Sequence, residues 1–290
     1  MKRYLLLLFF WSGLSLADSA VWRLSHGDNL LYLGGTLHIL SAQDYPLPAE
    51  FEQGYAAADK LVLEADIRQM QEPAFIQEMT ALLTLPQGQS LADKLSESTV
   101  TRLSEYLSGK GMQLEPLLHY KVAMLALMLT KMEMQQQGVD QQGVDMHFLA
   151  RAEADQKTLG FLESAMQQMR YLAEMGVGQE DEFIAYTLDD MQSLPQMLED
   201  LRGAWRRGDL KALEADGITP MQESHPKLYQ SLLKARNDLW VPQLLNMLED
   251  QPVELVLVGA LHLAGEDGLL AQLSRRGVKV EKLGSGRAEE

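Results

Sequence analysis

Two apolar segments, Leu30–Leu37 and Leu255–Leu261, constrain the fold of this chain more than any other feature of its sequence. Both consist almost entirely of apolar residues and glycine, without the polar–apolar alternation of a half-exposed strand. Such runs are typical of strands that are covered on both faces, which occur mainly in parallel sheets flanked by helices. The sequence therefore favours an α/β fold with these two strands at its centre.

The segment that follows the first of these strands supports a parallel arrangement. A helix is expected over Leu47–Asp59, and Lys60–Glu64 has the pattern of another buried strand, which together give a β–α–β unit. Further strands are expected at Val21–Leu24, Lys157–Glu163 and Val278–Leu283. No proline- or serine-rich linker divides the chain. We predict one α/β domain with a small, mainly parallel sheet and long helical insertions at about residues 68–155 and 165–250.

Turn-forming residues predict where the helices of these insertions begin and end. In the second insertion we expect breaks near Gly176, Pro195, Gly217 and Pro226. In the first, residues 136–140 and 141–145 repeat the same sequence, Gln-Gln-Gly-Val-Asp. Asp145, which ends the second copy, is placed to cap a helix over Met146–Asp155.

The first 17 residues have the form of a secretory signal. Lys2 and Arg3 precede an apolar run from Tyr4 to Leu16, and Ser15 and Ala17 supply small residues for cleavage after Ala17. The run is short for a membrane span, although an uncleaved anchor is the alternative. We expect residues 18–290 to form the mature domain, without a stable membrane span, in the periplasm or secreted.

Composition excludes several classes of function. The chain has 25 Lys and Arg against 41 Asp and Glu, a net charge of −16. Such a surface repels phosphate backbones, so we expect no nucleic-acid partner. The chain has no cysteine, which removes disulfides, thiolate metal sites and cysteine nucleophiles. Any metal ion would therefore be held by histidine and carboxylate side chains.

Four polar residues follow the expected buried strands, namely His38, Glu64, Glu163 and His262. The carboxyl ends of parallel strands meet at one edge of a sheet, where open α/β folds place their ligands. Two imidazoles and two carboxylates there suit a divalent metal ion, which activates water for hydrolysis. The alternative is a structural role, since a strand-end histidine is often only hydrogen-bonded, and Glu163 could cap the following helix.

Both histidines end the same short pattern, Gly-x-x-His, which begins at Gly35 and Gly259. A glycine without a Cβ atom lets backbone or ligand approach closely at the end of a strand. Residues three apart point to opposite faces of an ideal strand. We therefore expect the chain to turn at Leu37 and Leu261, so that each glycine lies beside its own histidine.

At these residues the sequence resembles the TraB/GumN family, which is related to the TIKI metalloproteases and more distantly to the ChaN and erythromycin-esterase group. The resemblance extends from Trp22 to Leu283 and is carried by Tyr32–His38, Leu63-Glu64, Gly143-Val144-Asp145, Leu162-Glu163-Ser164, Arg236-Asn237 and Val258–His262. It implies an α/β fold like that of the ChaN and erythromycin-esterase group. It also implies paired histidines at His38 and His262, a glutamate at Glu64 and an Arg-Asn pair at Arg236 and Asn237. In the TIKI branch the implied activity is proteolysis that depends on a divalent metal ion such as Mn, Co or Zn.

Two functions remain open from the sequence. In the first, the protein is an exported metal-dependent hydrolase of peptides or proteins. His38, His262 and Glu163 or Glu64 would hold the ion, the remaining glutamate would take a proton from water, and Arg236 with Asn237 would complete the catalytic group. In the second, the same crevice binds haem, a metal ion or a polysaccharide without turnover. Arg236 has a plainer reading as a surface residue between Lys234 and Asp238. The oligomeric state is not determined by the sequence.

Overall fold

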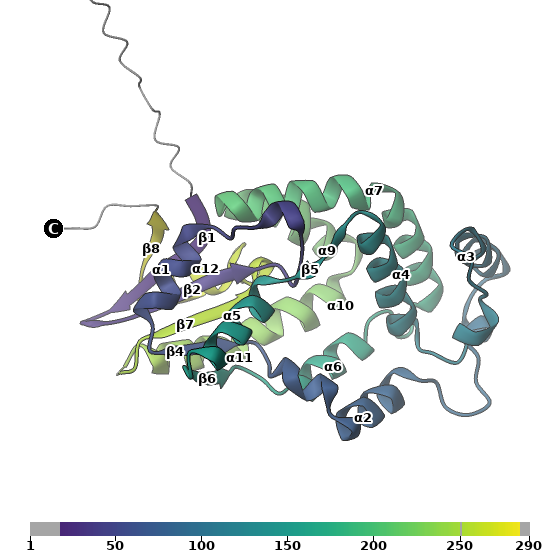
Figure 1. Ribbon diagram of the computed structural model, residues 1–290. Coiled ribbons are helices and arrows are strands. Elements are labelled where there is room, and N and C mark those ends of the chain that lie inside the picture. The colour runs from purple at the N-terminus through teal and green to yellow at the C-terminus, as the bar shows by residue number, and fades with distance from the viewer. Residues whose placement is uncertain (1–17, 250, 285–290) are drawn as a thin grey trace, which may run out of the picture.

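The computed structural model describes residues 18–249 and 251–284, so the expected signal peptide at residues 1–17 lies outside the described residues. At its centre is a six-stranded sheet with the strand order β6-β4-β7-β2-β1-β8 (Figure 1). Its strands are β1 (Asp18–His26), β2 (Asn29–Thr36), β4 (Lys60–Leu63), β6 (Thr158–Phe161), β7 (Glu254–Gly259) and β8 (Lys279–Gly284). The four strands from β6 to β2 are parallel, while β1 and β8 are antiparallel to their neighbours. The predicted small, mainly parallel sheet is confirmed.

The register of the parallel strands brings their carboxyl ends to one edge. Thr36 of β2 is paired with Gly259 of β7, and Leu63 of β4 is paired with Leu257 of β7. Leu63 is also the partner of Phe161 at the end of β6. The residues that follow these four strands therefore emerge side by side, as the sequence predicts for a β–α–β arrangement.

Helices make up most of the rest of the chain. They are α1 (Ala49–Ala57), α2 (Pro73–Leu83), α3 (Glu97–Gly109), α4 (Val122–Gln136), α5 (Val144–Ala154), α6 (Ala165–Ala173), α7 (Glu180–Arg207), α8 (Leu210–Leu213), α9 (Thr219–Ser224), α10 (Pro226–Tyr229), α11 (Ala235–Met247) and α12 (Leu269–Ser274). Two short helical turns matter for the site: η6 (Gln230–Lys234) precedes α11, and η7 (Ala260–Leu263) follows β7. None of the described helices combines the length and the apolar composition needed to cross a membrane.

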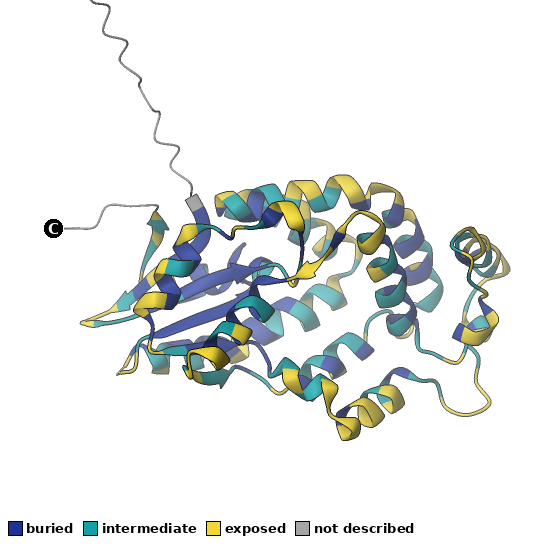
Figure 2. Cartoon of the chain, in the orientation of Figure 1, coloured by how far each residue is buried: buried dark blue, intermediate teal, exposed yellow. Residues whose placement is uncertain are grey.

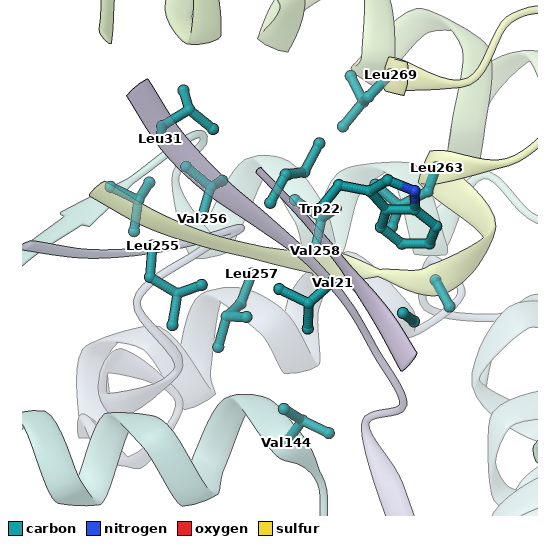
Figure 3. Packing of buried hydrophobic residues seen from close by; sticks show 14 of the residues in the cluster. Val21, Trp22, Leu31, Val144, Leu255, Val256, Leu257, Val258, Leu263 and Leu269 are labelled. Carbon is teal, nitrogen blue, oxygen red and sulfur yellow. The ribbon is translucent and has the colours of Figure 1, made fainter. Parts of the chain in front are cut away.

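The core lies on both faces of the sheet, as expected for strands that are apolar throughout. Leu257 and Val144 lie on one side of β7, where α1 and α5 cover the sheet, and Trp22 and Leu263 lie on the other side (Figure 3). The central strands are accordingly buried, whereas the helices beyond their carboxyl ends expose much of their surface (Figure 2). The strand residue Val256, for example, is fully buried.

A second, smaller sheet was not expected from the sequence. β3 (Ile39–Ser41) pairs antiparallel with β5 (Val139–Gln142), which lies inside the first helical insertion. Three of the four β5 residues are exposed, so the segment lacks the apolar pattern that marks a strand. Its pairing with β3 brings the second copy of the five-residue repeat next to His38.

The predicted helix break at Pro195 is wrong. Pro195 lies inside α7, which continues to Arg207. The two halves of this helix are held by different hydrophobic clusters: Phe183 packs among the helices of the insertions, and Trp205 packs in the core of the sheet. This packing on both sides offsets the hydrogen bond that the proline cannot make.

Candidate active site

The chain turns directly after both central strands. β2 ends at Thr36 and is followed by a bend at His38, and β7 ends at Gly259 and is followed by the helical turn η7, which contains His262. This is the turn that the Gly-x-x-His spacing requires, because a continued strand would point each histidine away from its glycine. Both imidazoles therefore lie at the carboxyl edge of the sheet.

The side chains of His38, Glu64 and His262 lie around Gly259. A Cβ atom at this position would lie 3.4 Å from Glu64 Oε1, 3.6 Å from His38 Nε2 and 3.6 Å from His262 Cδ2. At Gly35 a Cβ atom would lie 3.1 Å from the Cα atom of Ala260, so this glycine lets η7 pack closely against β2. The structure thus brings together His38, Glu64 and His262 from three separate strand ends.

His38 is held from one side by Asp145. Its Nδ1 lies 2.9 Å from Asp145 Oδ2, and Thr36 Oγ1 donates a hydrogen bond of 3.0 Å to Asp145 Oδ1. Because the carboxylate accepts, the Nδ1 atom of His38 carries a proton. The nearby Asp145 charge raises the pKa of His38 to about 9.

The expected capping role of Asp145 is wrong. Helix α5 begins at Val144, one residue before Asp145, and its N-cap residue is Gly143, which makes no side-chain cap. The carboxylate instead faces Thr36 and His38. Asp145 is a site residue that the sequence analysis missed, although it belongs to the Gly-Val-Asp motif of the resemblance.

His262 is buried and fixed by Asn237. Its Nδ1 lies 2.6 Å from Asn237 Oδ1, and the amide nitrogen of Asn237 donates to the carbonyl oxygens of His262 and Asp267. These bonds assign the amide orientation, so that His262 Nδ1 carries the proton and Nε2 is an acceptor. Nε2 accepts a hydrogen bond of 3.0 Å from Arg236 Nη1. Burial lowers the pKa of His262 to about 3, so the ring is neutral at pH 7.

Arg236 joins the two glutamates. Its Nη2 donates to Glu64 Oε2 at 2.6 Å and to Glu163 Oε1 at 2.7 Å, and its side chain is 8% exposed. This excludes the reading of Arg236 as a surface residue. Its pKa is raised because the two carboxylates outweigh the cost of burial. Both oxygens of Glu163 contact the guanidinium of Arg236. Helix α6 is capped by Ser164, so Glu163 is not the cap of that helix.

Glu64 is the most highly connected carboxylate of the site. Oε1 accepts a hydrogen bond of 2.7 Å from the backbone N–H of Gly259, and Oε2 accepts one of 2.8 Å from Gln168. Burial alone would raise the pKa of Glu64, but the Arg236 guanidinium, the His38 ring and the Gly259 N–H lower it. Glu163 lacks most of these partners, and its pKa is raised by burial.

The donor atoms suit a divalent metal ion in their chemistry. His38 and His262 each have Nδ1 occupied by an oxygen acceptor, which directs Nε2 toward a metal, while Nε2 of His262 accepts a hydrogen bond from Arg236 in this structure. His262 Nε2 lies 3.8 Å from Glu64 Oε1, a spacing that two ligands of one ion can have when each bond is roughly 2.0–2.2 Å long. Within residues 18–249 and 251–284, no three His, Asp or Glu side chains are already arranged to hold an ion. The donor set fits an ion in its chemistry, and an ion on His262 Nε2 would replace the hydrogen bond from Arg236 Nη1.

The fold and the site define an α/β protein whose histidines, glutamates and arginine meet at the carboxyl edge of a parallel sheet. A model of the TraB/PrgY/gumN family matches residues 20–282. The chain belongs to this family, as the resemblance in its motifs predicts.

Curated relatives have been described in bacteria and in animals. The chain is 26% identical to the uncharacterized protein YbaP of Escherichia coli (strain K12), over 86% of this chain and 89% of that protein. It is 23% identical to the metalloprotease TIKI1 of Homo sapiens, over 93% of this chain and 63% of that protein. No solved structure matches the chain.

Proposed function

We propose that this protein is an exported hydrolase that depends on a divalent metal ion and cleaves peptide bonds. One observation carries the proposal: two histidines that are far apart in the sequence face one buried carboxylate, Glu64, each with Nδ1 already bound to an oxygen atom. The similarity to TIKI1, which is named a metalloprotease, supports the choice of reaction. The metal would be Mn²⁺, Co²⁺ or Zn²⁺.

His38, His262 and Glu64 are the side chains that would hold the ion. A bound divalent ion would lower the pKa of water and polarise a substrate carbonyl group. We assign this place to Glu64 rather than Glu163, since both oxygens of Glu163 contact Arg236 whereas Glu64 Oε1 faces His262. The sequence alone left open whether Glu163 or Glu64 would be the carboxylate ligand.

Arg236 supplies a fixed positive charge beside these donors. Its guanidinium is held by Glu64, Glu163 and the carbonyl oxygen of Leu232, so its charge stays close to the position where negative charge would develop on a reacting carbonyl oxygen. Asn237 acts through His262, whose ring it orients. Glu163 keeps Arg236 in place, and its raised pKa also suits a group that accepts a proton.

The first described strand bears on the expected cleavage position. Asp18 of β1 pairs with Gly284 of β8. Ser19 and Ala20 are fully buried, so cleavage after Ala20 would remove residues of the core. We place the mature protein in the periplasm or outside the cell.

Binding without turnover remains a second candidate because His38 is open to solvent. Its side chain is 62% exposed, and haem ligation needs one accessible imidazole. A Soret band on titration with haem that disappears in the His38→Ala variant would favour this function over hydrolysis.

Metal content and peptide cleavage, measured on the same samples, test the proposal. The mature chain and the variants His38→Ala, His262→Ala and His26→Ala would be dialysed against Mn²⁺ or Zn²⁺ and analysed by mass spectrometry for metal. His26 is an exposed residue at the end of β1 and serves as the matched control. We expect about one ion per chain and cleavage of a mixed peptide library in the wild type and the control only. Equally low metal content in all four proteins would contradict the proposal.

A further inference from the structure

We infer that Asp145 is a positioning residue that holds the His38 ring with Nε2 toward Glu64, and that Thr36 in turn fixes Asp145. The inference rests on the proposed function in one respect, since it takes Nε2 as the atom with which His38 acts. It concerns a carboxylate that lies outside the histidines, glutamates, arginine and asparagine discussed above as ligands or catalytic groups.

His38 needs such a partner because its surroundings do not confine it. The residue lies on a bend rather than inside a strand, and its side chain is 62% exposed. An exposed side chain samples several rotamers, and each must be given up when the ring acts in one orientation. A hydrogen bond to a carboxylate is stronger than one between neutral groups, so the 2.9 Å contact with Asp145 can select one rotamer and keep a proton on Nδ1.

Asp145 is itself fixed to the sheet. Its side chain is 12% exposed, and the two carboxylate oxygens have different partners. Oδ1 accepts from Thr36, the buried last residue of β2, and Oδ2 accepts from His38 two residues later. The carboxylate thus links the rigid end of β2 to the bend that follows it.

The backbone around Asp145 is tied to the same bend. Val144 N donates to the carbonyl oxygen of Leu37 at 3.1 Å. At Gly143 a Cβ atom would lie 2.2 Å from the carbonyl oxygen of His38, so only glycine allows the two segments to approach this closely. The segments 36–38 and 143–145 are therefore packed together through backbone and side-chain contacts, and the Asp145–His38 hydrogen bond is one of these contacts.

The repeated sequence provides a matched control. Asp140 ends the first copy of Gln-Gln-Gly-Val-Asp, as Asp145 ends the second. Asp140 is exposed, and its side chain bonds to that of the adjacent Gln141. Asp140→Asn therefore changes the same residue in the same local sequence without affecting His38.

Two readouts on the full mature chain test the inference. The variants are Asp145→Ala, Asp145→Asn, Thr36→Val and the control Asp140→Asn, each checked for folding by circular dichroism. The first readout is the NMR signal of the His38 Nδ1 proton in metal-free protein. We expect a strongly downfield, slowly exchanging signal in the wild type and the control, its loss in Asp145→Ala and partial retention in Asp145→Asn, whose amide oxygen can still accept. Thr36→Val should leave the signal present but broader.

The second readout is the affinity for Zn²⁺ by calorimetry. We expect Asp145→Ala to bind about 10–100-fold more weakly than the control, which is the usual effect of losing a partner of a metal-binding histidine. Zn²⁺ affinity equal to that of the control, or a His38 proton signal that persists in Asp145→Ala, would overturn the inference. If the wild type binds no Zn²⁺, the proposed function fails, and the NMR readout alone decides whether Asp145 positions His38.

Discussion

At the scale of single residues, the site combines groups whose charges are set by their partners. His262 is neutral because it is buried, whereas Arg236 stays charged because two carboxylates face it. Glu64 is kept ionised by Arg236 and the Gly259 N–H. The site therefore holds a neutral imidazole, a carboxylate and a guanidinium within hydrogen-bond reach of one another, and the first two are ligand types that the proposed metal ion would use.

Removal of Arg236 should destabilise the fold strongly. In Arg236→Met, Glu64 and Glu163 would stay buried without their shared cation, and we expect the free energy of unfolding to fall by about 3–5 kcal/mol. The control is Arg170→Met, which breaks an exposed pair with Glu78 and should cost less than about 1 kcal/mol. Urea unfolding followed by circular dichroism measures both. Equal losses in the two variants would show that the buried network contributes little.

Acid should destabilise the metal-free protein through His262. The ring takes up a proton near pH 6.5 in the unfolded chain but only near pH 3 in the folded one, so the unfolded state binds more protons and the free energy of unfolding decreases as the pH falls below about 6.5. Down to about pH 5, above the ordinary value for Glu64, that carboxylate is ionised in the folded state and mostly so in the unfolded one. His262→Gln should therefore flatten the pH dependence between about 6.5 and 5. A slope that is unchanged in this variant would exclude His262 as its source.

At the scale of elements, local patterns predict the central sheet and the strand ends but not the contacts between distant segments. The apolar runs mark β2, β4 and β7, and because parallel strands end at one edge, His38, Glu64 and His262 could be expected to meet there. Asp145 could not be placed, because β5 is short and polar and owes its position to pairing with β3. Pro195 was misjudged for a related reason, since the packing of α7 in two clusters is not visible in its local sequence.

The junction between β5 and α5 should not tolerate a side chain at Gly143. In Gly143→Ala the new Cβ atom would clash with the backbone of His38, so that bend must move away from Asp145. We expect a lower melting temperature together with loss of the His38 proton signal. Gly109→Ala is the control, because no atom lies within 4 Å of the added group at the end of α3, where alanine is at least as favourable as glycine in a helix. Normal stability in Gly143→Ala would contradict the close approach.

At the scale of the whole molecule, the sheet and the helical insertions each contribute residues to the site. The sheet fixes His38, Glu64 and His262 at one edge, while α6 contributes Gln168 and α11 contributes Arg236 and Asn237 (Figure 1). The site is complete only when the insertions fold back onto the sheet edge.

The mature chain should begin at Asp18. Expression of the full-length sequence in a bacterium with a secretory pathway, followed by intact mass and N-terminal analysis of the exported protein, checks this expectation. A chain that began at Val21 would lose the buried residues Ser19 and Ala20 and the pairing of Asp18 with Gly284. We expect it to unfold at a lower temperature than the chain that begins at Asp18. Recovery of the uncleaved protein in the membrane fraction would instead indicate an anchor.

The central claim is that His38 and His262 hold the same metal ion together with Glu64. X-ray absorption spectroscopy at the zinc edge, on mature protein loaded with Zn²⁺, tests it most directly. The account predicts an inner shell with two imidazole nitrogens at about 2.0–2.1 Å and at least one carboxylate oxygen, and the loss of one imidazole in either His38→Ala or His262→Ala. A spectrum without imidazole scattering, or one that is identical in the wild type and both variants, would contradict the claim.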